Sequence, residues 1–275
     1  MHGDCHLRVL VNVVTLPCHM SIEKLVRTFS HDGVVANRIE RWLLGQQGQV
    51  NVDESLHQRL LELASPGETD RSAAFHASQI GGCHRRSLFD FHDLPKRVLT
   101  DSELALKFMD GTWRHIRWQM MLLMSGLAYD VEVPVAIPEL RFTGSMDALG
   151  NDGEDYGIEV KGWSAIPSEV VPYHYVQVQG YMMMSGLNRF VVLYEHKSTQ
   201  TVKEFLVLPD KQVQDEIRAE LEHLNALIDD ESIPEMLTGC MQQKGETFRD
   251  CPYRHICSDV YEWDDLVRLS QGEKE

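Results

Sequence analysis

The hydrophobic pattern of this chain changes from a helical to a strand period between residues 125 and 130, and this change constrains the fold most. Before it, apolar residues recur every three or four positions; after it, short apolar runs are separated by turn residues. The predicted elements are a helix over 101–125, strands over 130–137, 140–149 and 156–161, a helix from Pro172 to about Ser185, strands over 189–196 and 202–208, and a helix over 210–229. This order predicts an α/β (α+β) fold in which helices flank a mixed central sheet.

The N-terminal quarter of the chain is predicted to be a helical extension. Apolar residues have helical spacing over 21–64, with a break at Gly45–Gly48. The polar stretch Ser65–Ser72 contains Pro and Gly and is predicted to be a loop. We therefore divide the chain into an extension over residues 1–70 and a main domain over 71–275, which is long enough to bury a full core.

The apolar stretch Leu7–Leu16 raises the question of a targeting segment. Its flank carries Asp4 and little positive charge, which is unlike a signal peptide. A start codon assigned too early, with Met20 opening the protein, explains the stretch better. The chain has no run of about 18 apolar residues, so we expect no interaction with a membrane.

The charge of the chain is negative overall but uneven along the sequence. The net charge of −16 argues against a nonspecific coat for nucleic acid. Residues 71–120 hold eight Lys or Arg against five Asp or Glu, so this stretch carries 8 − 5 = +3 and the rest carries −19. We expect Arg85 and Arg86 to contact phosphates in a salt-sensitive way, although a mixed solvated surface explains the charges equally well.

Three charged residues lie on two neighbouring predicted strands. An antiparallel pair would bring Asp147 and Glu159 together across the ladder. Glu159 and Lys161 are two positions apart and project from one face, while the carbonyl of Val160 between them stays free to reach a metal. Two carboxylates hold a hard divalent cation, and a lysine beside them can position the attacking water. A salt-bridged strand surface is the alternative for these residues taken alone.

Two helices add polar residues to this set. Gln177 and Tyr181 are four positions apart, so they share one helix face, where an amide and a phenol suit hydrogen bonds to phosphate or to neighbouring side chains. His115 lies within the predicted helix over 101–125. Taken alone, His115 is interpreted as a surface or hydrogen-bonded helix histidine.

Together, these segments resemble the RecB-like branch of the PD-(D/E)XK nucleases. That family carries Gly-x-x-x-His, Gly-x-x-Asp, Asp/Glu-x-Lys and Gln-x-x-x-Tyr in this order. The matching segments here are Gly111–His115, Gly144–Asp147, Glu159–Lys161 and Gln177–Tyr181. The resemblance covers about residues 75–260 and implies a restriction-endonuclease-like core.

The resemblance also implies a role for each matching residue. The expected ligands of Mg²⁺ or Mn²⁺ are His115, Asp147, Glu159 and the carbonyl of Val160. The expected catalytic residues are Asp147, Glu159, Lys161, Gln177 and Tyr181. Lys161 would orient the hydrolytic water, and Gln177 and Tyr181 would organise the site or the scissile phosphate. Trp163 is interpreted as a packing residue, with stacking on a base as the alternative.

Four of the six cysteines form a pattern of one distant and three C-terminal residues. The four are Cys83, Cys240, Cys251 and Cys257; Cys5 and Cys18 lie outside the pattern. An intracellular protein would not pair them as structural disulfides. Four thiolates can instead hold a 4Fe–4S cluster or a zinc ion, and free buried thiols are the remaining alternative.

The cysteine pattern resembles the iron–sulfur subset of the same family, which includes CRISPR-associated exonucleases, the AddB nuclease and phage relatives. This resemblance implies one 4Fe–4S cluster that staples the segment around Cys83 to the C-terminal region. A zinc ion is the less favoured alternative to the cluster. One departure concerns Cys240: ten residues separate it from Cys251, where the family usually has two, and Phe248 stands at the expected position.

The function implied by the resemblance is a metal-dependent DNA exonuclease that acts on single-stranded or free DNA ends. It would work in the cytoplasm of a bacterial, archaeal or phage-infected cell, with protein partners from recombination, replication or CRISPR adaptation. Two alternatives stay open: an endonuclease or flap nuclease, and a noncatalytic subunit that binds DNA ends. Intact Glu159 and Lys161 argue against the noncatalytic alternative.

Overall fold

The structure is a computed structural model, and it describes residues 33–47, 49, 52–64, 73–97, 102–244 and 246–272. Several features of the sequence lie outside the described residues, namely Leu7–Leu16, Met20, Cys5, Cys18 and the predicted loop Ser65–Ser72. The division of the chain near residue 70 therefore stays a prediction. Within the described part, the helical stretch contains α2 (Ala36–Gln46) and α3 (Glu54–Ala64), separated near the expected glycines.

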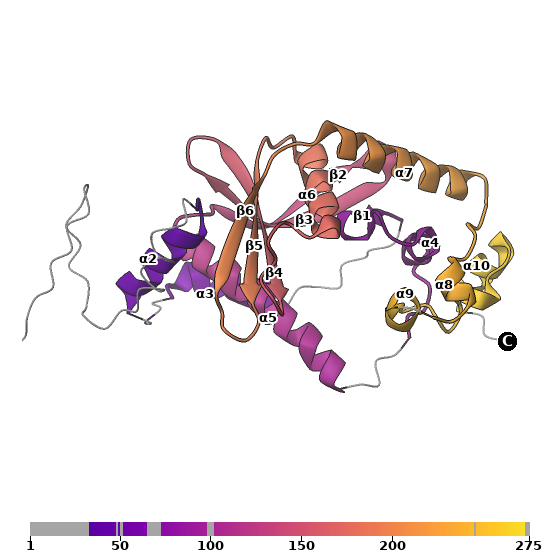
Figure 1. The fold of residues 1–275 in the computed structure, drawn as a ribbon, viewed down its shortest axis with the longest axis horizontal. Helices are drawn as coiled ribbons and strands as arrows, with labels where there is room; N and C mark the ends of the chain where they lie inside the picture. Colours follow the sequence, from indigo (N-terminus) through magenta and orange to yellow (C-terminus); the bar gives the residue numbers. More distant parts are fainter. Residues whose placement is uncertain are drawn as a thin grey trace, which may run out of the picture.

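A six-stranded mixed sheet lies at the centre of the fold, in the order β1-β3-β4-β5-β6 with β2 pairing β3. The strands are β1 (Phe75–His76), β2 (Asp130–Ile137), β3 (Phe142–Asn151), β4 (Asp155–Trp163), β5 (Phe190–His196) and β6 (Val202–Val207). β4 and β5 are parallel, whereas β2–β3, β3–β4 and β5–β6 are antiparallel. The mixed sheet flanked by helices is confirmed, and Figure 1 shows this arrangement.

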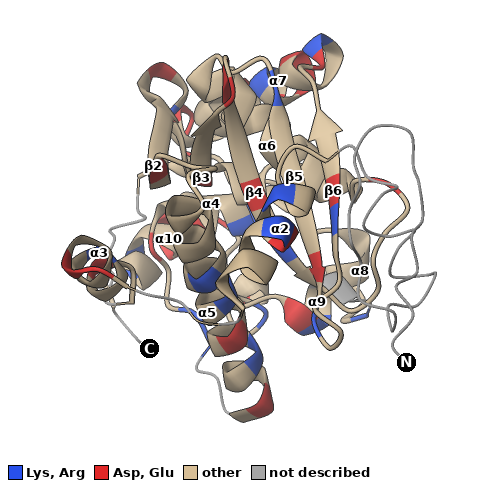
Figure 2. Cartoon of the chain, turned by 90° about the vertical axis from the view of Figure 1, so that its left-hand side faces the viewer, with Lys and Arg blue, Asp and Glu red and all other residues tan. Residues whose placement is uncertain are grey.

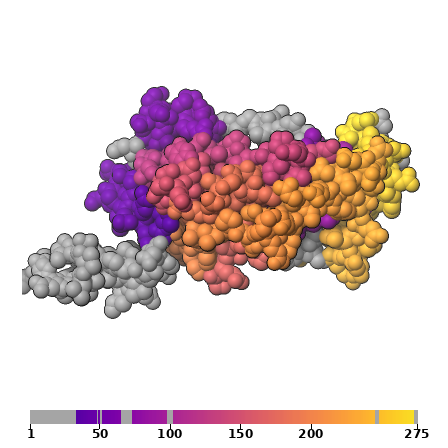
Figure 3. Space-filling model, turned by 90° about the horizontal axis from the view of Figure 1, so that it is seen from above, coloured from indigo at the N-terminus to yellow at the C-terminus, as the bar shows by residue number. Residues whose placement is uncertain are grey.

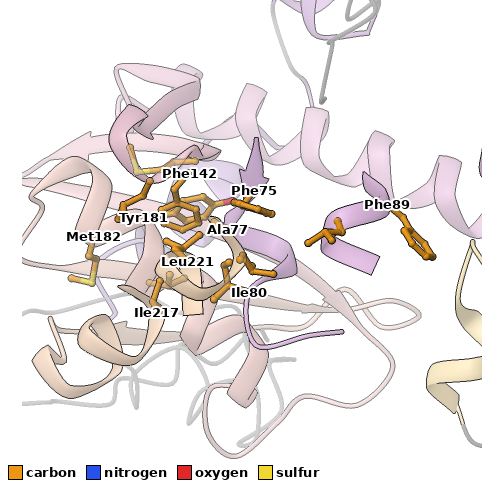
Figure 4. Close-up of a cluster of buried hydrophobic side chains, with 14 of the residues drawn as sticks. Phe75, Ala77, Ile80, Phe89, Phe142, Tyr181, Met182, Ile217 and Leu221 are labelled. Atoms are coloured by element: carbon orange, nitrogen blue, oxygen red, sulfur yellow. The ribbon is translucent and has the colours of Figure 1, made fainter. Parts of the chain in front are cut away.

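Helices cover both faces of the sheet and create two cores. On one face, α5 (Ser102–Met124) and α2 pack against the strands through residues such as Trp118 and Ile39. On the other face, α6 (Pro172–Ser185) and α7 (Lys211–Asp229) cover the larger core. Figure 4 shows part of that core, where Tyr181 of α6 lies beside Phe142 of β3. The sheet is therefore the middle of three layers.

The C-terminal region consists of short helices beyond the sheet. These are α8 (Thr238–Met241), α9 (Glu246–Asp250) and α10 (Trp263–Ser270), with the 3-10 turn η3 (Cys257–Asp259) between the last two. They lie near α4 (His84–Phe91), where the buried Tyr253 hydroxyl donates to Asp90 at 2.7 Å. Figure 3 shows this region and the N-terminal helices at opposite ends of the molecule. Among the described helices, none combines the length and apolar character needed to cross a bilayer.

Candidate active site

The candidate site lies on an edge of β3 that no strand occupies. β2 pairs along one edge of β3, whereas on the other edge β1 reaches only Phe142 and Thr143, and β4 begins its pairing at Ala148. Gly144–Asp147 therefore has no partner strand on that edge within the part of the chain that the structure describes. This segment is the Gly-x-x-Asp motif of the sequence, so the opening in the sheet and the motif coincide.

A break in strand alternation directs Asp147 into this opening. In a regular strand, residues two apart share a face, yet Met146 packs into one core and Ala148 into the other. The neighbouring strand breaks at the same level, because Glu132 opposite Asp147 has a left-handed φ of 51°. Sequence periodicity contains no sign of this irregularity.

The Asp147 carboxylate bonds to β4 at the level where backbone pairing between β3 and β4 has ended. Its Oδ2 accepts a hydrogen bond from the Val160 N–H at 2.7 Å, and its Oδ1 lies 2.9 Å from Nδ1 of His115 on α5. The last β3–β4 pair is Ala148 with Ile158, so one further step places Asp147 opposite Glu159, as the sequence predicted. The described structure thus joins α5, β3 and β4 at one carboxylate.

A second chain of hydrogen bonds joins β4 to α6. Lys161 Nζ donates to Glu159 Oε1 at 2.5 Å and to Gln177 Oε1 at 3.0 Å. The Gln177 amide nitrogen donates to the same Glu159 oxygen at 3.1 Å and to the Tyr181 hydroxyl at 2.8 Å. Gln177 therefore orients the catalytic lysine and glutamate candidates and links them to Tyr181.

Tyr181 explains the glycine of the Gly-x-x-Asp motif. A Cβ on Gly144 would lie 2.6 Å from Cε1 of the Tyr181 ring and 3.4 Å from Cβ of Ala77. The distance to the Tyr181 ring is too short for a side chain in a packed core. The glycine lets the Tyr181 ring pass over β3 and carry its hydroxyl to Gln177.

Burial and charge couple the titratable groups of the site. The negative charge of Asp147 raises the pKa of His115 to about 9 despite burial. Burial alone would raise the pKa of Asp147, but the charge and hydrogen bond of His115 hold it below its usual value. Burial, followed by the charge of Asp147, raises the pKa of Glu159 to about 7. A cation bound between the two carboxylates would therefore stabilise the charged forms of both.

The surroundings of one carboxylate oxygen in the site favour a bound metal ion. Glu159 Oε2 is buried without a hydrogen-bond partner among the described residues. A buried carboxylate oxygen is costly unless it is bonded or coordinates a cation. No group of three His, Cys, Asp or Glu within the described residues is yet arranged as a complete metal centre. The donor set of His115, Asp147 and Glu159 still fits a hard divalent cation by its chemistry.

A buried ion network that the sequence did not reveal anchors α5. Glu195 of β5 is 2% exposed and accepts hydrogen bonds from Arg117 at 2.5 Å and from Trp118 Nε1 at 2.7 Å. Arg114 Nη1 lies 3.1 Å from the same carboxylate. These three residues flank His115 on the helix, so the network fixes the height of His115 above Asp147.

The two arginines predicted to contact DNA have different surroundings. Arg85 is 6% exposed, and its guanidinium donates to the carbonyls of Pro234, Cys257 and Val260 at 2.5–2.9 Å. This geometry favours a structural role for Arg85 over the predicted phosphate contact. Arg86 is half exposed and has Asp90 as its nearest carboxylate, at 3.7 Å.

Internal ion pairs also use part of the predicted basic stretch. Figure 2 shows basic residues along α5, with acidic residues near the start of the helix. Arg114 and Arg117 of this helix bind Glu195, and Arg114 also bonds to Asp110 at 2.7 Å. Lys96 lies 2.7 Å from Asp90. The excess of positive charge over 71–120 therefore serves the fold as well as the surface.

The four predicted cysteine ligands line one cavity. This cavity of about 420 Å³ has in its wall Cys83, Cys240, Cys251 and Cys257, together with Arg86. The thiols are free and partly buried. Burial, followed by the charges of the other three thiolates, raises the pKa of Cys240. Cys240, whose spacing departs from the family pattern, thus lies with the other three.

Trp163 is part of a ring cluster at the start of α6. Its ring centroid lies 5.4 Å from His174, 6.2 Å from Tyr173 and 6.4 Å from Tyr194. These contacts agree with the interpretation of Trp163 as a packing residue. Tyr173, which the sequence analysis did not single out, is the exposed member of the cluster.

Comparison with known proteins gives only distant similarity. No protein-family model matches the sequence, and no curated protein matches it. SSO0001 has a TM-score of 0.46 and 16% identity, covering 74% of this chain and 94% of its own. The alkaline exonuclease LHK-Exo from Laribacter hongkongensis has a TM-score of 0.41 and 15% identity; its dAMP complex has 0.44 and 14%. Both LHK-Exo structures cover 58% of this chain and 90% of their own.

Proposed function

We propose that the protein is a metal-dependent deoxyribonuclease that hydrolyses phosphodiester bonds at single-stranded or free DNA ends. The observation that carries the proposal is the pair of buried carboxylates, Asp147 and Glu159, at an open sheet edge with Lys161 bonded to one of them. Glu159 Oε2 has no partner among the described residues, so the site has a place for a cation. A purely structural salt bridge between Lys161 and Glu159 would not explain why the second oxygen of Glu159 is buried without a partner.

In this proposal, His115, Asp147, Glu159 and the Val160 carbonyl hold Mg²⁺ or Mn²⁺. The bound ion would supply Lewis-acid polarisation of the phosphate and a more acidic water. Asp147, held by the Val160 N–H, keeps its charge and its orientation. In a strand, the N–H and the carbonyl of one residue point to the same edge, so the Val160 carbonyl faces the edge of β4 that bonds to Asp147.

Lys161 and Gln177 form the orienting part of the site. Burial alone would lower the pKa of Lys161, but the charges of Glu159 and Asp147 raise it above its usual value. The ammonium therefore stays charged and can hold a water or a phosphate oxygen by hydrogen bonds. Gln177 fixes the ammonium in place, and Tyr181 fixes Gln177 in turn.

The cysteine cavity is proposed to hold a 4Fe–4S cluster. Four thiols in one cavity match the ligand number of such a cluster, and zinc is the second candidate because it uses the same donors. The cluster would join α4 to the C-terminal helices and take no part in hydrolysis. Anaerobically purified protein should contain about four irons per chain; one stoichiometric zinc instead would replace only the cluster assignment.

The nuclease assignment is tested by incubating anaerobically purified protein with end-labelled single- and double-stranded DNA, with and without Mg²⁺ or Mn²⁺. We expect metal-dependent release of nucleotides from single-stranded ends, abolished in Asp147→Ala, Glu159→Ala and Lys161→Ala. Internal cuts in circular DNA would instead assign an endonuclease. Metal-independent cleavage, or full activity in Glu159→Ala, would refute the proposed site. End binding without any cleavage would assign a noncatalytic subunit.

A further inference from the structure

An aromatic side chain lies on the same helix face as two of the catalytic candidates. Tyr173, Gln177 and Tyr181 are spaced by four residues on α6, so their side chains lie along one stripe of the helix. The exposed fraction falls from 55% at Tyr173 to 6% at Gln177 and 4% at Tyr181. Tyr173 therefore stands at the solvent end of a stripe that leads into the site.

Neighbouring rings fix the position of Tyr173. Its ring packs edge-to-face on His174 with centroids 4.2 Å apart, and Trp163 lies 6.2 Å away. His174 is buried and its Nδ1 lies 2.8 Å from the Tyr194 hydroxyl, which also accepts a hydrogen bond from the Val171 N–H. A ring held this way loses little conformational freedom when a ligand packs on it.

Tyr173 is close to the charges that a nucleic-acid backbone would meet. Lys161 Nζ donates to Gln177 Oε1 at 3.0 Å, and Gln177 lies one helical turn after Tyr173 on the same face of α6. Tyr173 also lines the cysteine cavity together with the half-exposed Arg86. One exposed aromatic ring thus lines a cavity with one cationic side chain, Arg86, and stands one helical turn from the residue that binds Lys161.

This combination suits an unpaired base. A base offers a flat π-face whatever its identity, and single-strand binding proteins combine aromatic side chains with cations that track the phosphates. In a duplex both faces of a base are covered by its neighbours, so an intact duplex cannot use the Tyr173 ring in the same way. An exposed tyrosine that only packs against protein would not distinguish the two.

We propose that Tyr173, supported by Trp163 and His174, is a platform on which an unpaired base of the DNA stacks beside the scissile phosphate. This assignment rests on the proposed nuclease function and sharpens its substrate class to unpaired strands. The platform holds the nucleotide next to the one being cleaved, and Lys161 and the metal ligands act on the phosphate. Tyr173 is therefore a substrate-binding residue that leaves the metal site unchanged.

The test measures stacking directly in a protein that does not cleave. In a Glu159→Gln background, an oligonucleotide with a single 2-aminopurine, scanned along its first nucleotides, should show a change in fluorescence on binding at one position. Tyr173→Ala should remove that change and weaken single-strand binding about tenfold, whereas Tyr173→Phe should retain both. Tyr129→Ala is the matched control: Tyr129 is 57% exposed and bonds to Leu149, which pairs with Gly157 near the start of β4, whereas Tyr173 packs near Trp163 at the end of β4.

An abasic residue separates stacking from structure. Removing the base at the identified position should weaken binding to the wild-type ring by the same factor, and Tyr173→Ala should show no further loss. Equal losses for intact and abasic strands, or for single-stranded and duplex DNA, would overturn the platform. Tyr173→Leu, which keeps volume without a π-face, should behave like Tyr173→Ala. If wild-type protein cleaves no DNA, the proposed function fails, while this binding measurement still decides the platform.

Discussion

The candidate catalytic site and the cysteine cavity differ in what holds them together. At the candidate catalytic site, side-chain hydrogen bonds join four elements. Asp147 of β3 bonds to β4 and to α5, and Gln177 of α6 bonds to Lys161 of β4. In the cysteine region, the thiols line one cavity from short elements: Cys240 lies in the four-residue α8, and Cys251 directly follows the five-residue α9. From this comparison we expect that the fold alone preorganises the first site, whereas the second region would gain stability from what its thiols bind.

The largest expected effect separates the two regions by stability. Cys251→Ser should lose the cluster and cost at least about 3 kcal/mol, because ligand-binding free energy becomes folding free energy when it joins distant segments. In a chain of this size that corresponds to a fall in Tm of roughly 6–12 °C. Thermal unfolding followed by circular dichroism measures it.

Removal of the metal from the candidate catalytic site is the experiment to compare with Cys251→Ser. Removal of divalent ions with EDTA should abolish cleavage and leave Tm nearly unchanged, since hydrogen bonds within the protein hold the site. Cys18→Ser, outside the cysteine pattern, is the matched thiol control. Equal Tm values for Cys251→Ser and Cys18→Ser would remove the distinction between the two regions.

Two neighbouring arginines sharpen the comparison. Arg85→Met leaves three carbonyls without their donor and should cost about 2–3 kcal/mol, as expected for a hydrogen-bonded buried charge. Arg86→Met removes only a half-exposed side chain and should cost less than about 1 kcal/mol. Urea unfolding gives both values. Similar losses for both variants would show that Arg85 does not clamp the C-terminal helices.

Two motif glycines should respond in opposite directions. Gly144→Ala places a Cβ against the Tyr181 ring and should cost about 1–3 kcal/mol and much of the activity. Gly111→Ala lies within α5, where a Cβ meets no described atom within 4 Å, so it should stabilise the protein by up to about 1 kcal/mol. Denaturant midpoints and cleavage rates compare them. A stabilised, fully active Gly144→Ala would contradict the role of Tyr181.

A pH dependence of stability is expected at His174. Burial, followed by the charge of Lys161, lowers the pKa of His174 from 6.5 to about 3. Its contribution to stability is therefore complete above pH 6.5 and is lost as pH falls towards 3, by up to about 1.4 kcal/mol per pH unit. His174→Asn should flatten this part of the profile. Identical slopes for variant and wild type between pH 6.5 and 4 would show that His174 charges freely in the folded protein.

The parts of the fold that periodicity could predict are local. The helix over 101–125 is α5, and the strands and the helix from Pro172 lie within a few residues of their expected bounds. The sequence also predicted that Asp147 and Glu159 lie opposite each other. A short turn joins β3 to β4, and such a turn sets the register of an antiparallel pair.

The parts that periodicity missed depend on contacts between distant segments. Arg85 bonds to Val260, 175 residues away, and Arg117 to Glu195, 78 residues away. No local pattern distinguishes such an arginine from a solvated one, which explains why Arg85 was expected to contact phosphate. The short strand β1 and the helices α8 and α9 were not predicted for a different reason, since elements of two to five residues have too few positions to show a period.

The measurement that tests the central claim most directly is Mn²⁺ binding followed by electron paramagnetic resonance. Wild-type protein should bind Mn²⁺ at the site of His115, Asp147 and Glu159. Asp147→Asn and Glu159→Gln should each weaken that binding at least about tenfold, with Tm unchanged. Asp215→Asn, on the exposed side of α7, should bind as the wild type does. Unchanged Mn²⁺ affinity in both site variants would contradict the assignment of these carboxylates as metal ligands.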